Sequence, residues 1–219
     1  MADITLIIPA HNEAKYIDAV LAPVALSGLF AEVIVVDDGS SDGTHSAAQK
    51  HSDVRVIRLD SNRGKARALA AGLAEAKHDI IAFLDADIVG ITAGHLAALV
   101  QPVINGKARA TIAVFKRGRF ATDFSHWATP YISGQRCIRL DALAGFDRWN
   151  DVGFGIEVAL NDHLRRSGVV QQVIPWVGVT QVMKEEKRGW VRGFASRLGM
   201  YWDILRYRLG TTRSGNKRA

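Results

Sequence analysis

The segment DIIAFLDAD, residues 79–87, decides the fold of this chain. It begins as a short, nearly continuous apolar run, residues 80–84, and such a run is typical of a strand buried on both faces of a parallel sheet. Two carboxylates, Asp85 and Asp87, follow directly. Ligands of α/β sheets bind beyond the carboxyl ends of the strands, where paired aspartates suit Mg²⁺ or Mn²⁺ together with phosphate oxygens. The alternative is an ordinary acidic turn, because Asp-x-Asp is a common tripeptide.

Three upstream segments repeat the pattern of a buried strand that ends in a polar turn. The expected strands are residues 4–8, 32–36 and 54–59, and Pro9 should end the first, because proline cannot donate to a ladder. Helices are expected from 13 to about 25 with Asn12 as the cap, after a cap at Asp42, and from the segment 62–65 to about 77. Strands that alternate with helices predict two βαβ units, a parallel sheet and right-handed crossovers.

The downstream half is less regular. The elements expected there are a helix at 92–104, strands at 108–115 and 132–140, a helix at 154–167 that Gly168 ends, and one or two strands within 169–182. Residues 116–130 are polar, basic and aromatic without a period, which predicts a long loop near the site. The domain boundaries that follow are a catalytic domain at 1–183, an appended helix at 184–210 and a disordered tail at 211–219.

The composition excludes several classes of protein. Apolar residues make up 48% of the 219 residues, yet no apolar run reaches the roughly 18 residues of a membrane span, and the N-terminus lacks the features of a signal peptide. A single cysteine, Cys137, rules out an intrachain disulfide, so we expect a cytoplasmic location and a small buried residue at this position. The glycine-rich dinucleotide fingerprint and the Walker lysine loop are both absent. These absences argue against a simple Rossmann dehydrogenase and a P-loop enzyme.

The net charge of +6 is concentrated in the appended helix and tail. From Lys184 onward there are ten bases and three acids, whereas the rest of the chain has 18 bases and 19 acids. Residues 188–209 form an amphipathic basic pattern with an aromatic and aliphatic stripe at helical spacing. One interpretation is contact with an anionic surface at the inner face of a membrane. The other is packing on the sheet or on a second copy in a homodimer. The neutral body argues against nucleic acid as a partner.

The motifs, taken together, resemble the family-2 glycosyltransferases with their A-type (GT-A) fold. Five of them match in order over residues 4–170: IIPAHNE, VVDDGSSDGT, NRGKARALAAG, FLDAD, and AGFD followed by GIEVALNDHLRRSG. The resemblance implies a GT-A-like, mostly parallel twisted sheet flanked by helices, with a nucleotide site at the carboxyl ends of the strands. It also implies metal-dependent, inverting transfer from a nucleoside-diphosphate sugar of the UDP or GDP type to an acceptor hydroxyl or phosphate. The basic tail is the one reason to expect a lipid-linked acceptor.

The resemblance assigns residues to the nucleotide sugar and the metal. Those expected at the nucleotide sugar are Pro9, Ala10, His11, Glu13, Asp38, Lys65, Asp85 and Ala86. Asp38 should accept a hydrogen bond from the base, and Lys65 with Arg63 should meet phosphate. Asp87 should bind Mg²⁺ or Mn²⁺ directly, while Asp85, the second metal candidate, faces the sugar or ribose.

Each assignment has a structural alternative. Asp37, beside Asp38, is as well explained as a turn residue that binds its own backbone amides. Glu13 suits the first turn of a helix, where a carboxylate complements the helix dipole. Lys65 and Arg63 suit a solvated helix start.

Glu157 is the candidate general base that deprotonates the acceptor. When LRRSG is set on the family's helix end, Glu157 falls on the second acid of its Glu-Asp motif, and Ile156 replaces the first acid. Asp151 and Asp162 are alternative bases, and a helix N-terminal acid is the structural alternative.

Several other positions stay open. Gln181 lies where some related enzymes carry a metal-binding histidine, and an amide is a poor replacement. His126 and His163 have no assigned role, and a helical histidine such as His163 is more often a packing residue. Trp127 and Trp149 could stack on a sugar or belong to the core. The rival classes of protein are a sugar nucleotidyltransferase and a catalytically silent relative.

Overall fold

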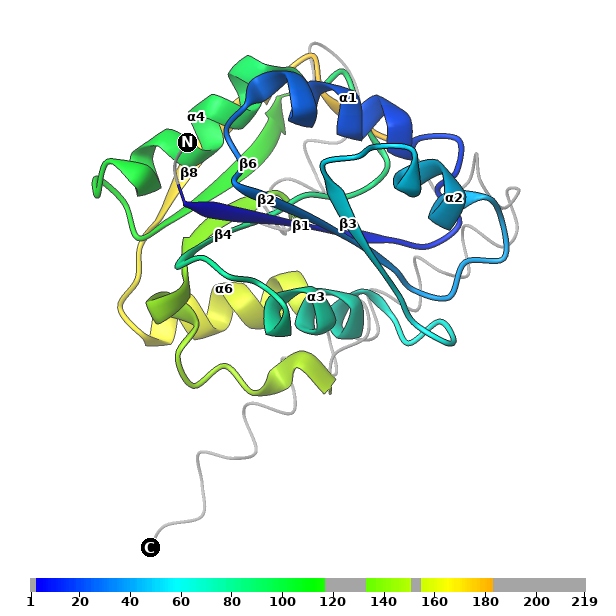
Figure 1. The fold of residues 1–219 in the computed structure, drawn as a ribbon. Helices are drawn as coiled ribbons and strands as arrows, with labels where there is room; N and C mark the ends of the chain where they lie inside the picture. The colour runs from blue at the N-terminus through cyan, green and yellow to red at the C-terminus, as the bar shows by residue number, and fades with distance from the viewer. Residues whose placement is uncertain (1–2, 117–132, 151–154, 183–219) are drawn as a thin grey trace, which may run out of the picture.

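The centre of the molecule is a seven-stranded sheet with the order β3-β2-β1-β4-β7-β6-β8 (Figure 1). The computed structural model describes residues 3–116, 133–150 and 155–182. All neighbours in the sheet pair in parallel except β7, which is antiparallel to both β4 and β6. The strands are β1 (Ile4–Ala10), β2 (Glu32–Asp37), β3 (Val54–Arg58), β4 (Ile80–Phe83), β6 (Ala110–Lys116), β7 (Arg136–Arg139) and β8 (Gln171–Val177). The predicted mostly parallel sheet is confirmed.

Helices cover both faces of the sheet (Figure 1). One face carries α1 (Ile17–Ser27), α2 (Thr44–Gln49) and α4 (Ala93–Ile104), and the other carries α3 (Lys65–Ala74) and α6 (Ile156–Arg166). Along β1, Leu6 and Ile8 pack into the first layer and Ile7 into the second. This burial on both faces explains why the central strands are continuously apolar.

Three shorter pieces lie beside the sheet. The two-stranded antiparallel pair β5 (Ile88–Val89) and β9 (Thr180–Gln181) directly follows the acidic motif, and two 3₁₀ turns, η1 (Leu140–Leu143) and η2 (Arg148–Asn150), precede α6. The segment 169–182 therefore holds two strands. Gly168, in a left-handed conformation with φ +69°, follows the end of α6 as expected.

Two expectations near the N-terminus are wrong. Pro9 does not end β1, since it pairs with Val36 and the strand continues to Ala10. The Ala10 carbonyl faces β2, where it accepts from the Asp38 amide at 2.8 Å. By alternation the Pro9 nitrogen points to the β4 side, where the ladder has already ended at Phe83, so no hydrogen bond is lost.

The second error concerns Asn12, which does not cap a helix. Its φ is +57°, its side-chain oxygen accepts from the Ser41 amide at 2.9 Å, and α1 begins only at Ile17. The Asn12 side chain thus links the loop after β1 to the loop after β2. Asparagine can take this position because it tolerates the left-handed conformation. The predicted inner face of α1 is confirmed by its buried residues Ile17, Val20, Leu21 and Val24.

The other boundaries differ from the predictions by a few residues. α3 ends at Ala74, three residues early, and the strand expected at 132–140 is limited to β7. The predicted cap at Asp42 is wrong, because Gly43 occupies the cap position of α2, and Asp42 Oδ1 instead accepts from the Thr44 amide at 2.9 Å in the turn before it.

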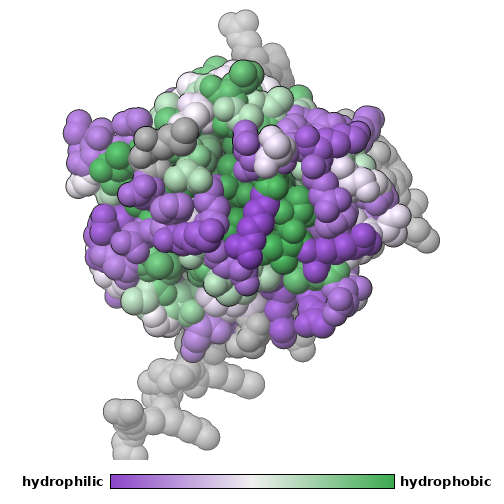
Figure 2. All heavy atoms as spheres, in the orientation of Figure 1, coloured by the Kyte–Doolittle hydropathy of each residue, from purple (hydrophilic) through white to green (hydrophobic). Residues whose placement is uncertain are grey.

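Several predicted features lie outside the described residues. They are the loop beyond Lys116 with His126 and Trp127, the alternative base Asp151, the appended helix at 184–210 and the tail at 211–219. Within the described ranges, no helix has the length and apolar character needed to cross a membrane. Hydrophilic side chains cover much of the face shown in Figure 2, with smaller apolar patches between them. Most large apolar residues of the described part are instead buried in the two hydrophobic cores, one on each face of the sheet.

Candidate active site

The two aspartates of the acidic motif lie at the carboxyl edge of the sheet, as predicted. β4 ends at Phe83, and the chain continues through the buried residues Leu84 and Ala86. Asp85 and Asp87 are each only 8% exposed. Carboxylates so deeply buried need polar or charged partners, and other elements of the fold supply them.

Lys65 links the acidic motif to the candidate base. Its ammonium nitrogen, from the first residue of α3, lies 2.5 Å from Asp85 Oδ1 and 2.6 Å from Glu157 Oε1. Glu157 stands in the first turn of α6, 92 residues further along the chain. The structure thus brings together three residues that the sequence placed in separate motifs.

The electrostatics of this group are those of a buried ion bridge. Burial alone would lower the pKa of Lys65, but the carboxylates of Asp85 and Glu157 outweigh it and raise that pKa above its usual range. Burial would raise the pKa of Asp85, yet the Lys65 charge and hydrogen bonds from Lys65, Gln135 and Gln181 lower it. Lys65 and Asp85 are therefore both charged at neutral pH.

Gln181 lies between the two aspartates. β9 pairs with β5 immediately after the motif, and the Val182 amide donates to the Asp87 carbonyl at 3.1 Å. This pairing places Gln181 Nε2 at 2.9 Å from Asp87 Oδ1 and 3.2 Å from Asp85 Oδ2. Gln181, expected where some related enzymes carry a metal-binding histidine, therefore lies at the acidic motif itself.

These residues fit a divalent cation of the magnesium or manganese type. Asp85 and Asp87 present carboxylate oxygens at the carboxyl edge of the sheet, and Gln181 Nε2 donates to one oxygen of each. Carboxylate oxygens are the ligands that these hard cations prefer. The described residues contain no group of three or more histidine, cysteine or acidic side chains that could hold a metal. Mg²⁺ does not require such a cage, because it keeps several waters and commonly binds one or two carboxylates plus substrate phosphates.

The start of β7 supplies partners that sequence reasoning missed. Gln135, 1% exposed, donates to Asp85 Oδ2 at 2.8 Å, and Ser133 Oγ donates to Gln135 Oε1 at 2.6 Å. Gly134 lies so close to the ion bridge that a Cβ on it would fall 2.5 Å from Lys65 Nζ. The segment SGQR gave no signal of this role, because its position beside β4 depends on strand order.

The second-strand loop and the third-helix entry are held together by Asp38. Its two carboxylate oxygens accept from the backbone amides of Arg63 and Gly64, each at 2.8 Å. Each oxygen has a second lone pair, so base contact by Asp38 stays a prediction. Asp37 Oδ1 accepts from the Ser40 amide at 2.9 Å, which confirms Asp37 as a turn residue.

Close backbone contact also holds these loops. Gly39 has a φ of +64°, and a Cβ there would lie 2.5 Å from the Ser61 carbonyl carbon. Only glycine fits this position.

The first-strand residues border the same loops. His11 Nδ1 lies 2.8 Å from the Asp38 carbonyl oxygen, and the Glu13 amide donates to Thr44 Oγ1 at 2.8 Å. Glu13 precedes α1 by four residues, so the alternative of helix-dipole complementation in a first turn is wrong. Pro9 and Ala10 are the last two residues of β1 and lie at this edge of the sheet. Their contact with a nucleotide stays a prediction.

Four other candidates have structural positions. Trp149 packs edge-on against Phe146, with ring centroids 4.7 Å apart, in the core beneath α3 and α6. His163 also packs on Phe146, at 5.3 Å, as expected of a helical histidine. Cys137 is fully buried, and burial raises the pKa of its thiol to about 12. Asp162, the alternative base, forms ion pairs with the arginines at the end of α6, Arg165 and Arg166.

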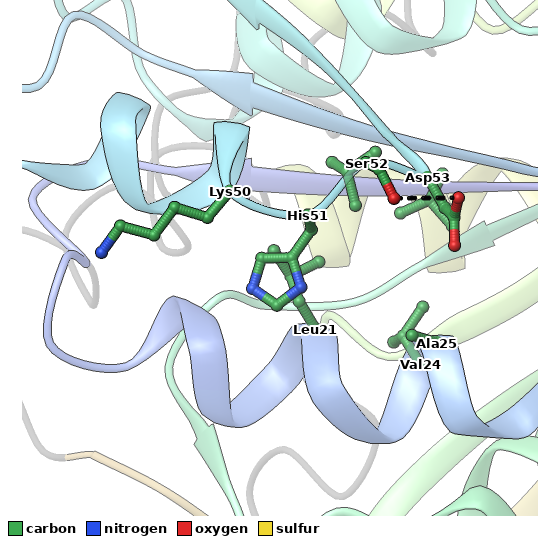
Figure 3. Close-up of a pocket in the computed structure, with 9 residues that line it drawn as sticks. Leu21, Val24, Ala25, Lys50, His51, Ser52 and Asp53 are labelled. Atoms are coloured by element: carbon green, nitrogen blue, oxygen red, sulfur yellow. Dashed lines mark hydrogen bonds between the residues drawn. The ribbon is translucent and has the colours of Figure 1, made fainter.

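A separate hollow lies beside α1 at the first residues of β2 and β3 (Figure 3). Its volume is about 250 Å³, and it is lined by α1, the start of β2 and the loop that enters β3. Figure 3 shows His51 above Leu21, with Ser52 and Asp53 at the rim. It shares no residue with the group around Lys65.

The chain belongs to glycosyl transferase family 2, whose family model matches residues 5–162. This membership decides against the sugar nucleotidyltransferase interpretation. It confirms the predicted family and agrees with the predicted fold.

Curated relatives match over part of the chain. The poly-beta-1,6-N-acetyl-D-glucosamine synthase of Staphylococcus aureus is 38% identical over 90 residues, which are 39% of this chain and 22% of that protein. The dolichol-phosphate mannosyltransferase of Pyrococcus furiosus is 37% identical over 90 residues, 39% of this chain and 26% of that protein. The matched part is thus about a quarter of these relatives or less.

Solved structures match more of the chain. Glucosyl-3-phosphoglycerate synthase from Mycobacterium tuberculosis, in complex with Mn²⁺, uridine diphosphate and glucosyl-3-phosphoglycerate, superposes with a TM-score of 0.67 at 23% identity. The match covers 91% of this chain and 81% of that chain. At this identity the likeness shows the fold, which is that of the GT-A glycosyltransferases.

Proposed function

We propose that this chain transfers a sugar from a nucleoside-diphosphate sugar to an acceptor hydroxyl or phosphate, with inversion at the anomeric carbon. The observation that carries the proposal is the ion bridge Asp85–Lys65–Glu157 at the carboxyl edge of the sheet. It joins the acidic motif of β4 to the candidate base on α6. If Asp85 serves the donor and Glu157 the acceptor, only the Lys65 side chain separates the two carboxylates.

Asp87 and Asp85 would hold Mg²⁺ or Mn²⁺, which, when bound, offsets the charge on the departing nucleoside diphosphate. The solved relative binds Mn²⁺ and uridine diphosphate on the same fold, which supports a cation and a UDP-type donor here. The all-oxygen donor set of this chain suits hard cations.

Glu157 would accept the proton of the acceptor hydroxyl. The acceptor oxygen then bonds to the anomeric carbon, the bond from that carbon to the phosphate oxygen breaks, and its electron pair leaves with the nucleoside diphosphate. Lys65 holds the Glu157 carboxylate from the side of Asp85.

Two observations bear on the class of acceptor. The archaeal relative is named for transfer involving dolichol phosphate, and the basic segment at 184–210 would suit an anionic lipid surface. We therefore propose a lipid-linked acceptor at a membrane face as the first class to test. A soluble acceptor such as phosphoglycerate, present in the solved relative, is the second.

A thermal-shift screen of nucleoside diphosphates and their sugars, with and without Mn²⁺, tests the donor. A ligand at 100 times its dissociation constant adds about 2.7 kcal/mol of stability. Transfer is then assayed with the best donor and both acceptor classes. Metal-dependent binding without turnover on any acceptor would favour the catalytically silent relative instead.

A further inference from the structure

The first residue of β7, Arg136, is a fully buried cation, 1% exposed, that contacts the backbone of Glu157, a member of the ion bridge. Its Nη1 donates to Asn161 Oδ1 at 2.8 Å and to Gln171 Oε1 at 3.3 Å, and its Nη2 donates to the Glu157 carbonyl at 3.3 Å. Its Nε donates to the Ser133 carbonyl at 2.9 Å. One guanidinium thus connects β7, β8 and α6.

A buried cation is costly unless it is fully hydrogen-bonded. Burial lowers the pKa of Arg136 to about 10, although the nearby charges of Glu157 and Asp85 act in the opposite direction. The group therefore remains charged at neutral pH. An apolar residue of similar volume would fill the same space without this cost, so packing alone does not explain an arginine here.

The contacts of Arg136 converge on the turn of α6 that carries Glu157. Asn161 stands four residues after Glu157, and residues at this spacing share one face of a helix. Arg136 therefore holds this turn at two points, the Glu157 carbonyl and the Asn161 side chain. Gln171 Nε2 also donates to Asn161 Oδ1, at 3.0 Å, and so fixes the amide that receives the guanidinium.

We propose that Arg136, acting through Asn161, is a positioning residue that holds the Glu157 carboxylate in place for proton transfer. This inference rests on the proposed role of Glu157 as the base. A planar guanidinium reaches three segments at fixed angles, which the single ammonium of a lysine cannot reproduce.

The test uses Arg136→Lys and Asn161→Ala in the full chain. Arg139→Lys is the matched control, because Arg139 lies on the same strand, is partly exposed and pairs with Asp141 at the surface. Thermal melting, donor binding and steady-state kinetics are measured for all three. Misplacing a reacting group by about 1 Å can cost 100-fold. We expect kcat to fall about 10- to 100-fold in both test variants, with donor affinity within a few-fold of wild type.

A double-mutant cycle with Glu157→Gln separates positioning from general support of the fold. If Arg136 acts through Glu157, then Arg136→Lys or Asn161→Ala should cost little further activity once Glu157 is glutamine. A further loss as large as in the wild-type background would overturn the inference, as would unchanged kcat in both single variants. Should Arg136→Lys fail to fold, Asn161→Ala, which removes one acceptor from a half-buried position, decides alone.

The outcomes also separate this inference from the function beneath it. Loss of turnover in Glu157→Gln with full turnover in Asn161→Ala and Arg136→Lys refutes only the positioning role. Near-normal turnover in Glu157→Gln refutes Glu157 as the base, and the positioning role with it.

Discussion

Gly134→Ala should disable the site without removing any polar group. A Cβ on residue 134 would lie 2.5 Å from Lys65 Nζ and 2.6 Å from both carboxylate oxygens of Asp85. Ordinary van der Waals contact begins at 3.4 Å, so the ion bridge would have to move by about 0.8 Å, the scale at which displacement costs about 100-fold in rate. Gly134 itself has no left-handed φ, so the effect comes from space alone.

We expect kcat to fall about 100-fold and the unfolding free energy to fall by about 1–3 kcal/mol, the usual cost of overpacking. Turnover is measured at saturating donor, and stability by urea unfolding. The matched control is Gly94→Ala in the first turn of α4, where the nearest atom to a new Cβ, Thr92 Oγ1, is at an ordinary 3.7 Å. That variant should be neutral or up to about 1 kcal/mol more stable, because alanine favours helices.

Wild-type turnover and stability in Gly134→Ala would contradict this prediction. It would mean that the Lys65 side chain can leave Asp85 without consequence. The close approach at residue 134 would then be incidental to catalysis.

Asp87→Ala should keep the fold and lose Mn²⁺-dependent stabilisation by UDP or GDP; undiminished metal-dependent binding in calorimetry would remove Asp87 from the metal site. Glu157→Gln should bind donor normally and lose turnover by about 100-fold or more, and a change within a few-fold would send the search to Asp151. Because the pKa of Asp85 is lowered, its ion pair stabilises the protein above the ordinary aspartate value of about 3.9 and is lost as pH falls through the lowered value. Melting curves should therefore show a steeper acid loss for wild type than for Asp85→Asn. Anionic vesicles should bind the chain at low salt and release it as salt rises, and sedimentation should weaken, with little change in melting temperature, when three tail arginines become glutamine, namely Arg192, Arg197 and Arg206.

The parts of the site that the sequence predicted all stand at the ends of elements. Asp85 follows β4, Lys65 begins α3 and Glu157 lies in the first turn of α6. The resemblance to the family assigned Lys65 and Glu157 to the site, and the convergence of such ends on one edge of a parallel sheet explains why they lie in one neighbourhood. Their mutual distances were not predictable, and Lys65, expected at phosphate, is found bridging two carboxylates.

Predictions from local sequence were wrong where the conformation of a residue depends on contacts with a distant segment. Asn12 carries a strong cap signal, but its oxygen is taken by Ser41 from the loop after β2. Pro9 carries a strong stop signal, but the hydrogen bond that its nitrogen cannot donate would lie on the β4 side, where the pairing between β1 and β4 has already ended. In both cases the decisive partner lies about 30 or more residues away, which no local pattern can include.

The antiparallel strand β7 explains why the supporting residues were missed altogether. A chain of alternating strands and helices predicts neighbours that follow one another, whereas β7 inserts between β4 and β6 and runs the opposite way. This reversal brings the start of β7, rather than its end, to the carboxyl edge, with Arg136 opposite Phe83. Gln135 consequently donates to Asp85, and Arg136 donates to the Glu157 carbonyl. A strand's first residues are ordinarily remote from a site at the carboxyl edge, and here the antiparallel direction alone makes them part of it.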